Sequence, residues 1–193
     1  VYTGLRMSLK MLLPEVFEPA PNQVMAYGLC LQTSDFGAGA LYLRVFCLRL
    51  WCTNYALTED LVKKVHLSKR LPDDLALSAE TYRLDTATMV SAIRDITQSG
   101  LSKDSIVKHN GMIRDAYDEG ISAADVKAFL KKRLNKDDAN QVIEVFSSPD
   151  VSNVPPGQNR LRLSNAISWV AQSMDDGRML EMQKVAGDAM AVA

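Results

Sequence analysis

Residues 34–54 read SDFGAGALYLRVFCLRLWCTN, and this stretch decides the fold of the chain. Gly37 and Gly39 predict a hairpin turn, because glycine tolerates the positive φ values that tight turns require. The following run, residues 41–53, is rich in aliphatic and aromatic side chains and predicts a β-strand. Its length exceeds the common strand length of about 3–10 residues, so we expect a bulge or sharp bend between Val45 and Leu50.

Two further strands are expected before this turn. Apolar and polar residues alternate through residues 5–13, which is the pattern of a half-buried strand with a basic outer face. Pro14 is expected to end that strand, because proline cannot continue a central ladder. Residues 23–33 form the second candidate strand.

Helical signals dominate from Ala79 onward. Met89, Ile93 and Ile96 share one helical face, and a Ser-Gly pair at 99–100 resembles a helix stop. Ser122 and Asp125 resemble a capping box at the start of another helix. Later helices are expected over residues 136–146, 160–174 and 178–190, with a proline-rich loop over 147–158. His109 is expected to be a surface or capping residue.

The order of these elements, strands first and helices after, predicts an α+β fold. We expect an antiparallel sheet of about three N-terminal strands, with at least one hairpin, covered by a C-terminal helical layer. Residues 1–72 would form the sheet portion and residues 73–193 the helical portion, packed together as one domain. The chain opens on Val1 inside a strand-like pattern, so we expect that upstream residues are missing.

Charge is distributed unevenly although the net charge is only −1. Residues 1–72 carry eight Lys and Arg against five Asp and Glu, whereas residues 73–193 carry fourteen against eighteen. A basic half is suited to meeting a polyanion while the acidic half faces water. No apolar run approaches the ~20 residues that cross a bilayer, and three apolar-flanked cysteines fit a reducing compartment. These features predict a cytoplasmic protein.

No catalytic or metal motif accompanies this pattern. Cys30, Cys47, Cys52 and His66 lack the short Cys-x-x-Cys clamps of structural zinc, so we expect core cysteines and neither a metal nor a cofactor. A thiolate pair of Cys52 with His66 is an alternative, but nothing nearby in the sequence activates the thiol. The glycine turn also lacks the lysine and helix start of a phosphate loop. We therefore expect that the chain is not an enzyme.

Three segments resemble a family of uncharacterised phage/plasmid-like proteins, a domain of unknown function found in mobile elements. The first is the 34–54 block with its Arg49, Cys52, Thr53 and Asn54 end; the second is VHLSKRL with His66 and Arg70. The third combines Asn165-Ala166-Ile167-Ser168 with Val185-Ala186-Gly187. The resemblance implies a phage or plasmid context in a bacterial cytoplasm, and it carries no established activity.

A set of cations interleaved with aromatic side chains suggests a groove for single-stranded nucleic acid, because charges follow phosphates while rings stack on bases. A bulge between Arg44 and Arg49 would bring both arginines to one face. The candidate nucleic-acid-binding residues are Arg6, Lys10, Tyr42, Arg44, Arg49, Trp51, Lys63, Lys64, His66, Lys69 and Arg70. The alternative is that the rings pack on the core and carboxylates satisfy the arginines.

The functional hypothesis is a nucleic-acid-associated phage or plasmid protein that binds or anneals single-stranded DNA in recombination. Its outline is similar to that of phage single-strand annealing proteins, a likeness of fold class alone. The alternative is a non-enzymatic phage structural or protein-interaction factor. The apolar face of the opening strand also predicts a homo-oligomer, because open strand edges invite pairing between chains.

Overall fold

The computed structural model describes residues 7–33, 41–49, 55–57, 63–65, 78–148 and 154–191. Within these ranges the strands are β1 (Met7–Phe17), β2 (Met25–Thr33), β3 (Leu41–Arg49), β4 (Tyr55–Leu57) and β5 (Lys63–Val65). The helices are α1 (Ala79–Gly100), α2 (Lys103–Asp118), α3 (Ala123–Lys131), α4 (Lys136–Ser147), α5 (Arg160–Ala171) and α6 (Asp176–Ala191). The predicted α+β order is confirmed.

The strands form one antiparallel sheet in the order β1-β2-β3-β4, and β5 pairs with β3 as well. β4 pairs with residues 46–48 of β3, whereas β5 pairs with residues 41–43. The two short strands therefore follow one another along the same edge of β3. The predicted glycine turn between β2 and β3 lies outside the described residues, but the antiparallel pairing that it would connect is present.

Pro14 does not end the first strand, so that prediction was wrong. β1 continues to Phe17, and its register with β2 shifts between Leu12 and Val16. Among the described strands β1 lies at the sheet edge, where a proline interrupts no second ladder. A bulge at an edge also bends the strand and discourages further pairing.

The bulge expected in the third strand is not found in its described part. β2 and β3 pair without a break from the Gln32–Tyr42 pair to the Met25–Arg49 pair. Side chains of a regular strand alternate between faces, so Arg44 and Arg49 lie on opposite faces of the sheet. The irregularity belongs to β1 instead, where an edge strand has fewer hydrogen bonds to lose.

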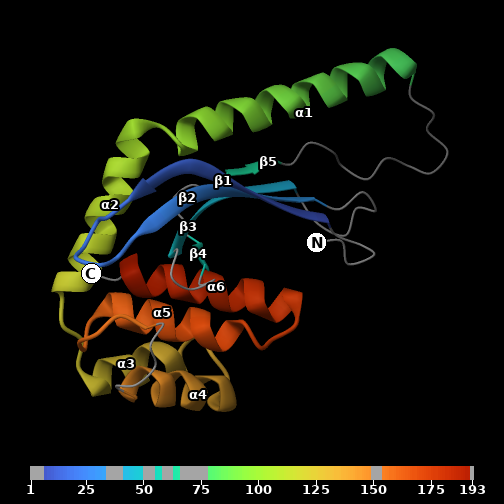
Figure 1. Cartoon of the computed structure of the whole chain (residues 1–193). Coiled ribbons are helices and arrows are strands. Elements are labelled where there is room, and N and C mark those ends of the chain that lie inside the picture. Colours follow the sequence, from blue (N-terminus) through green and yellow to red (C-terminus); the bar gives the residue numbers. More distant parts are fainter. Residues whose placement is uncertain are drawn as a thin grey trace.

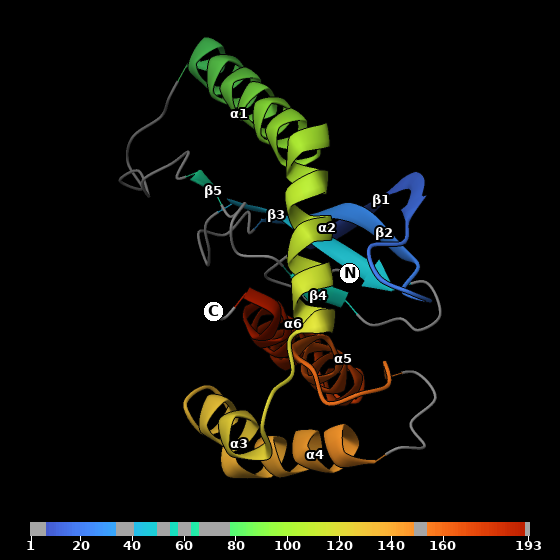
Figure 2. The ribbon, with the colours of Figure 1, turned by 90° about the vertical axis from the view of Figure 1, so that its left-hand side faces the viewer.

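The main core joins the sheet to the helices that follow it. One side of β2 and β3 contributes Tyr27, Leu29 and Val45 to a buried cluster that also contains residues of α2, α3, α4, α5 and α6. Figures 1 and 2 show the sheet between α1 above and the α5–α6 pair below, with α2 running past the end of the sheet between them. Packing against helices from the whole C-terminal half therefore holds the sheet in place.

Local sequence signals set the helix ends. Ser122 accepts a hydrogen bond from the Asp125 backbone N–H at 3.1 Å and donates its hydroxyl to the Asp125 carboxylate at 2.6 Å. The predicted Ser122 cap is thus confirmed, although Asp125 binds the Ser122 hydroxyl and not the backbone N–H as in a full capping box. Ser78, Ser102, Asn135 and Asn159 cap α1, α2, α4 and α5 in the same way. None of the helices that the structure describes has the length and apolarity needed to cross a membrane.

His109 is buried rather than exposed, which corrects the sequence prediction. It lies on the inner face of α2 with Ile113 and Ala116, and its ring centroid is 5.9 Å from that of Tyr27. Tyr27 donates its hydroxyl to Asn110 at 2.6 Å, so this pair links β2 to α2 across the core. Burial raises the pKa of the Tyr27 phenol far above its usual value, which keeps the hydroxyl a donor.

Arg162 ties the loop before α5 to the helical layer. Its side chain is buried and donates to the backbone carbonyls of Phe146 at 2.7 Å and Pro155 at 2.6 Å, and also to that of Ser148. Burial lowers the pKa of this guanidinium. The carbonyls satisfy the donors of the buried cation and fix the end of α4 against the start of α5.

Gly28 lets β1, β2 and β3 approach closely. It pairs with Leu12 on one side and with Phe46 on the other. A Cβ atom at this position would come within 2.2 Å of the Met11 carbonyl oxygen and 2.7 Å of the Phe46 ring. The fully buried ring of Phe46 thus occupies the space that any side chain at position 28 would need.

Candidate nucleic-acid interface

The sheet register aligns two of the predicted basic residues. Lys10 on β1 pairs with Cys30 on β2, and Cys30 pairs with Arg44 on β3. Directly paired residues project from the same face of an antiparallel sheet, so Lys10 and Arg44 flank Cys30 on one face. Lys10 is exposed and Arg44 is half-buried, whereas Cys30 has no exposed surface and forms a small buried cluster with Phe46 and Leu48, against which Leu180 of α6 packs.

The neighbouring row of the register carries two more predicted positions. Gln32 pairs with Tyr42, and Tyr42 pairs with Lys64 on β5. Positions 42 and 44 have the same parity on β3, so this row belongs to the same face as Lys10 and Arg44. We call this face, with positions 10, 42, 44 and 64, the basic face of the sheet.

Lys63 and Arg49 occupy positions of the opposite face. Lys63 pairs with Leu43, and Arg49 pairs with Met25, which is part of the main core. Only 8% of Arg49 is exposed. The sequence prediction joined Arg44 and Arg49 in one groove through a bulge, and the regular register separates them.

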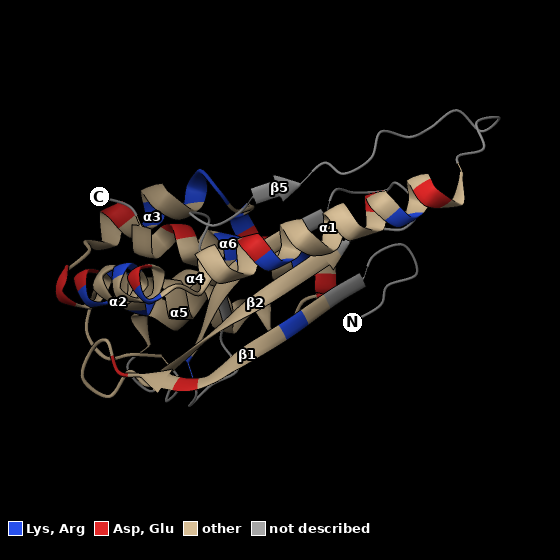
Figure 3. Cartoon of the chain, turned by 90° about the horizontal axis from the view of Figure 1, so that it is seen from above, with Lys and Arg blue, Asp and Glu red and all other residues tan. Residues whose placement is uncertain are grey.

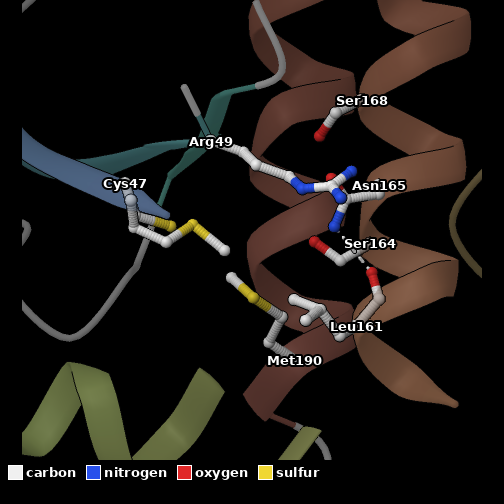
Figure 4. A pocket seen from close by; sticks show the side chains of 8 residues that line it. Cys47, Arg49, Leu161, Ser164, Asn165, Ser168 and Met190 are labelled. Carbon is white, nitrogen blue, oxygen red and sulfur yellow. Dashed lines mark hydrogen bonds between the residues drawn. The ribbon is translucent and has the colours of Figure 1, made fainter. Parts of the chain in front are cut away.

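Arg49 lies instead in a small pocket between the end of β3 and helix α5. Its side chain extends toward Asn165 and Ser168, as Figure 4 shows. Ser164, Leu161, Cys47, Met25 and Met190 complete the lining of a cavity of about 10 Å³, which is room for roughly one water molecule. Asn165 donates its side-chain amide to the Leu161 carbonyl at 2.8 Å, which fixes the orientation of the amide.

This pocket brings together two segments that were noticed separately in the sequence. Arg49 belongs to the 34–54 block, and Asn165 and Ser168 belong to the Asn-Ala-Ile-Ser segment of α5. Ser164 was missed by sequence reasoning. The sequence signal for Ser164 is the set of small polar residues in a helix that is nearly all buried. Ser168 follows Ser164 by four residues and Asn165 adjoins it, so the three lie on one side of α5.

The remaining predicted residues are not placed by the structure. Arg6, Trp51, His66, Lys69 and Arg70 lie outside the described residues, as do Cys52, Thr53 and Asn54 of the resemblance. Their roles stay predictions from the sequence. Cys30 and Cys47 are buried and form no disulfide, as expected of core cysteines. The described part of the chain holds no group of three or more His, Cys, Asp or Glu side chains able to share a metal ion.

The helical layer carries charges of both signs. Lys and Arg alternate with Asp and Glu along the helices in Figure 3, and several of them pair. Arg178 contacts Asp138 at 2.5 Å and Glu181 at 2.7 Å, contacts that raise the pKa of its guanidinium. Carboxylates of the helical layer thus engage the Arg178 guanidinium.

No protein-family model, curated protein or solved structure matches this chain. The resemblance to phage/plasmid-like proteins therefore stays a prediction from the sequence segments that carry it. The functional argument has to come from the geometry of the sheet and of the surfaces around it.

Proposed function

We propose that the chain binds single-stranded nucleic acid on the basic face of the sheet, as a non-enzymatic phage or plasmid protein in the cytoplasm of a bacterial host. The observation that carries the proposal is the register, which puts positions 10, 42, 44 and 64 of β1, β3 and β5 on one face of the sheet in two neighbouring rows. Neighbouring strands lie about 4.8 Å apart, so a strand of nucleic acid crossing them meets successive cations along its path. Annealing of complementary strands in recombination is the activity that we propose for such a surface.

We expect this site to bind with modest affinity and the affinity to fall as the salt concentration rises. Three phosphate contacts, from Lys10, Arg44 and Lys64, correspond to a slope of about −2 when log affinity is plotted against log salt for a single strand. Tyr42 is the residue whose ring we propose for base stacking, a contact typically worth ~1–3 kcal/mol per base. Arg49 and Lys63 are outside this site because their positions belong to the other face.

The test uses two adjacent lysines of β5 as a matched pair. Binding of a labelled single-stranded oligonucleotide is measured by fluorescence anisotropy at several salt concentrations. We expect Lys64→Ala to weaken binding and to reduce the salt slope by about 0.7, whereas Lys63→Ala leaves both unchanged. Lys10→Ala combined with Arg44→Ala should reduce the slope by about twice that amount.

Two outcomes would contradict the proposal, one for the binding site and one for the function. Equal effects of Lys63→Ala and Lys64→Ala would reject this face as the binding site. No measurable binding by the unmutated protein at low salt would reject the nucleic-acid function altogether.

A protein-interaction or structural role is the second candidate, and a specific observation favours it. Among the residues that the structure describes, the large apolar side chains that remain exposed lie on β1, α1 and α2. Exposed apolar surface gathered on a few elements marks sites of association in soluble proteins.

A further inference from the structure

The basic face of the sheet continues past its cations into a pair of apolar residues on β1. Lys10 and Leu12 are two residues apart before the register shift, so both project from this face. Val16 pairs with Ala26, and Ala26 pairs with Leu48, an even-numbered position of β3 like the other members of the basic face. Leu12 and Val16 therefore share the face of Lys10, and we call these two residues the apolar strip.

Both side chains of the apolar strip are open to water. Leu12 is 51% exposed and Val16 is 56% exposed. Leu13, which lies between them, is partly buried against the main core. The bulge in β1 thus turns Leu13 inward and keeps the two residues of the strip outward. Figure 3 shows β1 along one side of the molecule, with β2 between it and the helices.

The neighbouring apolar residues of this face are covered within the chain. Phe46 has no exposed surface, and its ring lies over Gly28, the partner of Leu12. Leu180 of α6 packs against the cluster that contains Phe46 and Leu48. Among the large apolar side chains of the sheet that the structure describes as exposed, those on this face are therefore the two of the apolar strip.

The charges beside the apolar strip indicate what binds it. Lys10 is exposed and lies two residues before Leu12, a spacing of roughly 7 Å along a strand. Arg44 lies in the same row as Lys10. Glu15 is exposed in the bulge between Leu12 and Val16, and its carboxylate repels a phosphate. Phosphates are thus attracted to the row of Lys10 and Arg44, and the part of a nucleotide suited to the apolar strip is its base.

We propose that Leu12, with Val16 beside it, contacts the unstacked bases of a single strand whose phosphates lie on the basic face. The inference rests on the proposed function and adds to it a preference for single strands. Exposed apolar side chains, leucine among them, insert beside bases and disrupt base stacking. The bases of a duplex are paired and stacked inside it, so a single strand offers the base faces that such a contact needs. An aliphatic contact reads no hydrogen-bond pattern and therefore accepts different base sequences.

The test compares two leucines of β1 that project from opposite faces. Leu9 is 47% exposed, close to the 51% of Leu12, but it pairs with Leu31 of the main-core face. Leu12→Thr should weaken the binding of labelled oligo-dT about fivefold, the effect of removing about half of a leucine side chain from an apolar contact. The salt slope should stay the same, because no charge is removed. Leu9→Thr should change neither the affinity nor the slope.

A duplex of oligo-dT with oligo-dA serves as the second probe. Its affinity should be equal in the unmutated protein, Leu9→Thr and Leu12→Thr, because its bases are not available to the apolar strip. Circular dichroism verifies that each variant is folded. If Leu12→Thr does not fold, Val16→Thr is the second variant, since threonine has the shape of valine and suits a strand; it should weaken oligo-dT binding at least about twofold.

The outcomes separate this inference from the proposed function. Equal affinities of Leu9→Thr and Leu12→Thr for oligo-dT would overturn the inference alone, and a lower molar mass of Leu12→Thr in light scattering would then assign the apolar strip to a contact between copies of the chain. An equal loss of duplex binding in Leu12→Thr would also overturn it, since the contact would not depend on unstacked bases. Absence of oligo-dT binding by the unmutated protein would reject the proposed function and this inference with it.

Discussion

Because Gly28 is in close contact with both neighbouring strands, we expect that a side chain at this position would destabilise the protein. In Gly28→Ala the new Cβ would lie 2.2 Å from the Met11 carbonyl oxygen and 2.7 Å from the Phe46 ring. The first neighbour is backbone, and the second is a ring with no exposed surface. Neither can move without disturbing the pairing of β1, β2 and β3.

The size of the effect follows from two opposing terms. Overpacking of a tight core costs about 1–3 kcal/mol, and occasionally more. Alanine recovers roughly 0.5–1 kcal/mol relative to glycine through the smaller entropy loss on folding. Because the closer clash is with backbone, we expect a net loss of about 2 kcal/mol, which lowers the unfolding temperature by roughly 4–8 °C in a chain of this size.

Gly111 provides the matched control. It lies inside α2, and a Cβ there would meet nothing within 4 Å. Gly111→Ala should therefore stabilise the protein by up to about 1 kcal/mol, the difference in helix propensity between the two residues. The assay is thermal and urea unfolding followed by circular dichroism. If Gly28→Ala unfolded at the temperature of the unmutated protein, Phe46 would not be seated over Gly28 and the reasoning would be refuted.

Three further predictions concern the helical layer and its contact with the sheet. Arg162→Met leaves the carbonyls that the guanidinium binds without their donor and should cost about 2–4 kcal/mol in urea unfolding; a loss no larger than that of a surface substitution would contradict the role of this side chain. Ser122→Ala should cost ~1 kcal/mol by removing the cap of α3, while Ser122→Asp should keep most of it. Burial raises the pKa of Tyr27 above that of an unfolded tyrosine, so the unfolded chain loses its proton first, and stability should fall as the pH rises above about 10. Tyr27→Phe should lose ~1 kcal/mol near neutral pH and show a smaller decline above pH ~10, and an identical decline in both proteins would exclude Tyr27 as its source.

The fold class was predictable because its signals are local. The period of two in the first strands and the Ser122–Asp125 cap depend on neighbours in the sequence, and both appear in the structure. The bounds of α1 were also predictable, since a serine cap precedes it and a Ser-Gly pair ends it. Propensity and capping act within a few residues and so are visible without tertiary information.

The wrong predictions concern residues whose environment is set by segments distant in the sequence. Pro14 is compatible with β1 only because β1 lies at the sheet edge, and the sequence does not say which strand is at an edge. His109 is buried because α2 turns this face toward Tyr27. Its spacing of four from Ile113 was a usable signal, since residues four apart share a helical face.

The candidate site was only partly predictable, because it also depends on pairing between distant segments. The parity of β3 indicates that Arg44 and Arg49 differ in face unless a bulge intervenes, and only the register decides between these possibilities. The alignment of Lys10 with Arg44 through Cys30 depends on pairing between separate segments, which sequence spacing does not specify.

The position of α6 has a consequence for how the chain must be synthesised. The end of the sheet at Met25 and Arg49 is covered by Leu161 of α5 and Met190 of α6, so this covering is synthesised well after the strands. At about 5–20 residues per second, roughly 7–28 seconds pass between translation of β3 and of the last turn of α6. Until α5 and α6 are synthesised, the end of the nascent sheet lacks the side chains that bury its apolar surface. A chain lacking its last helix should therefore be retained by chaperones or aggregate, even though every strand is intact.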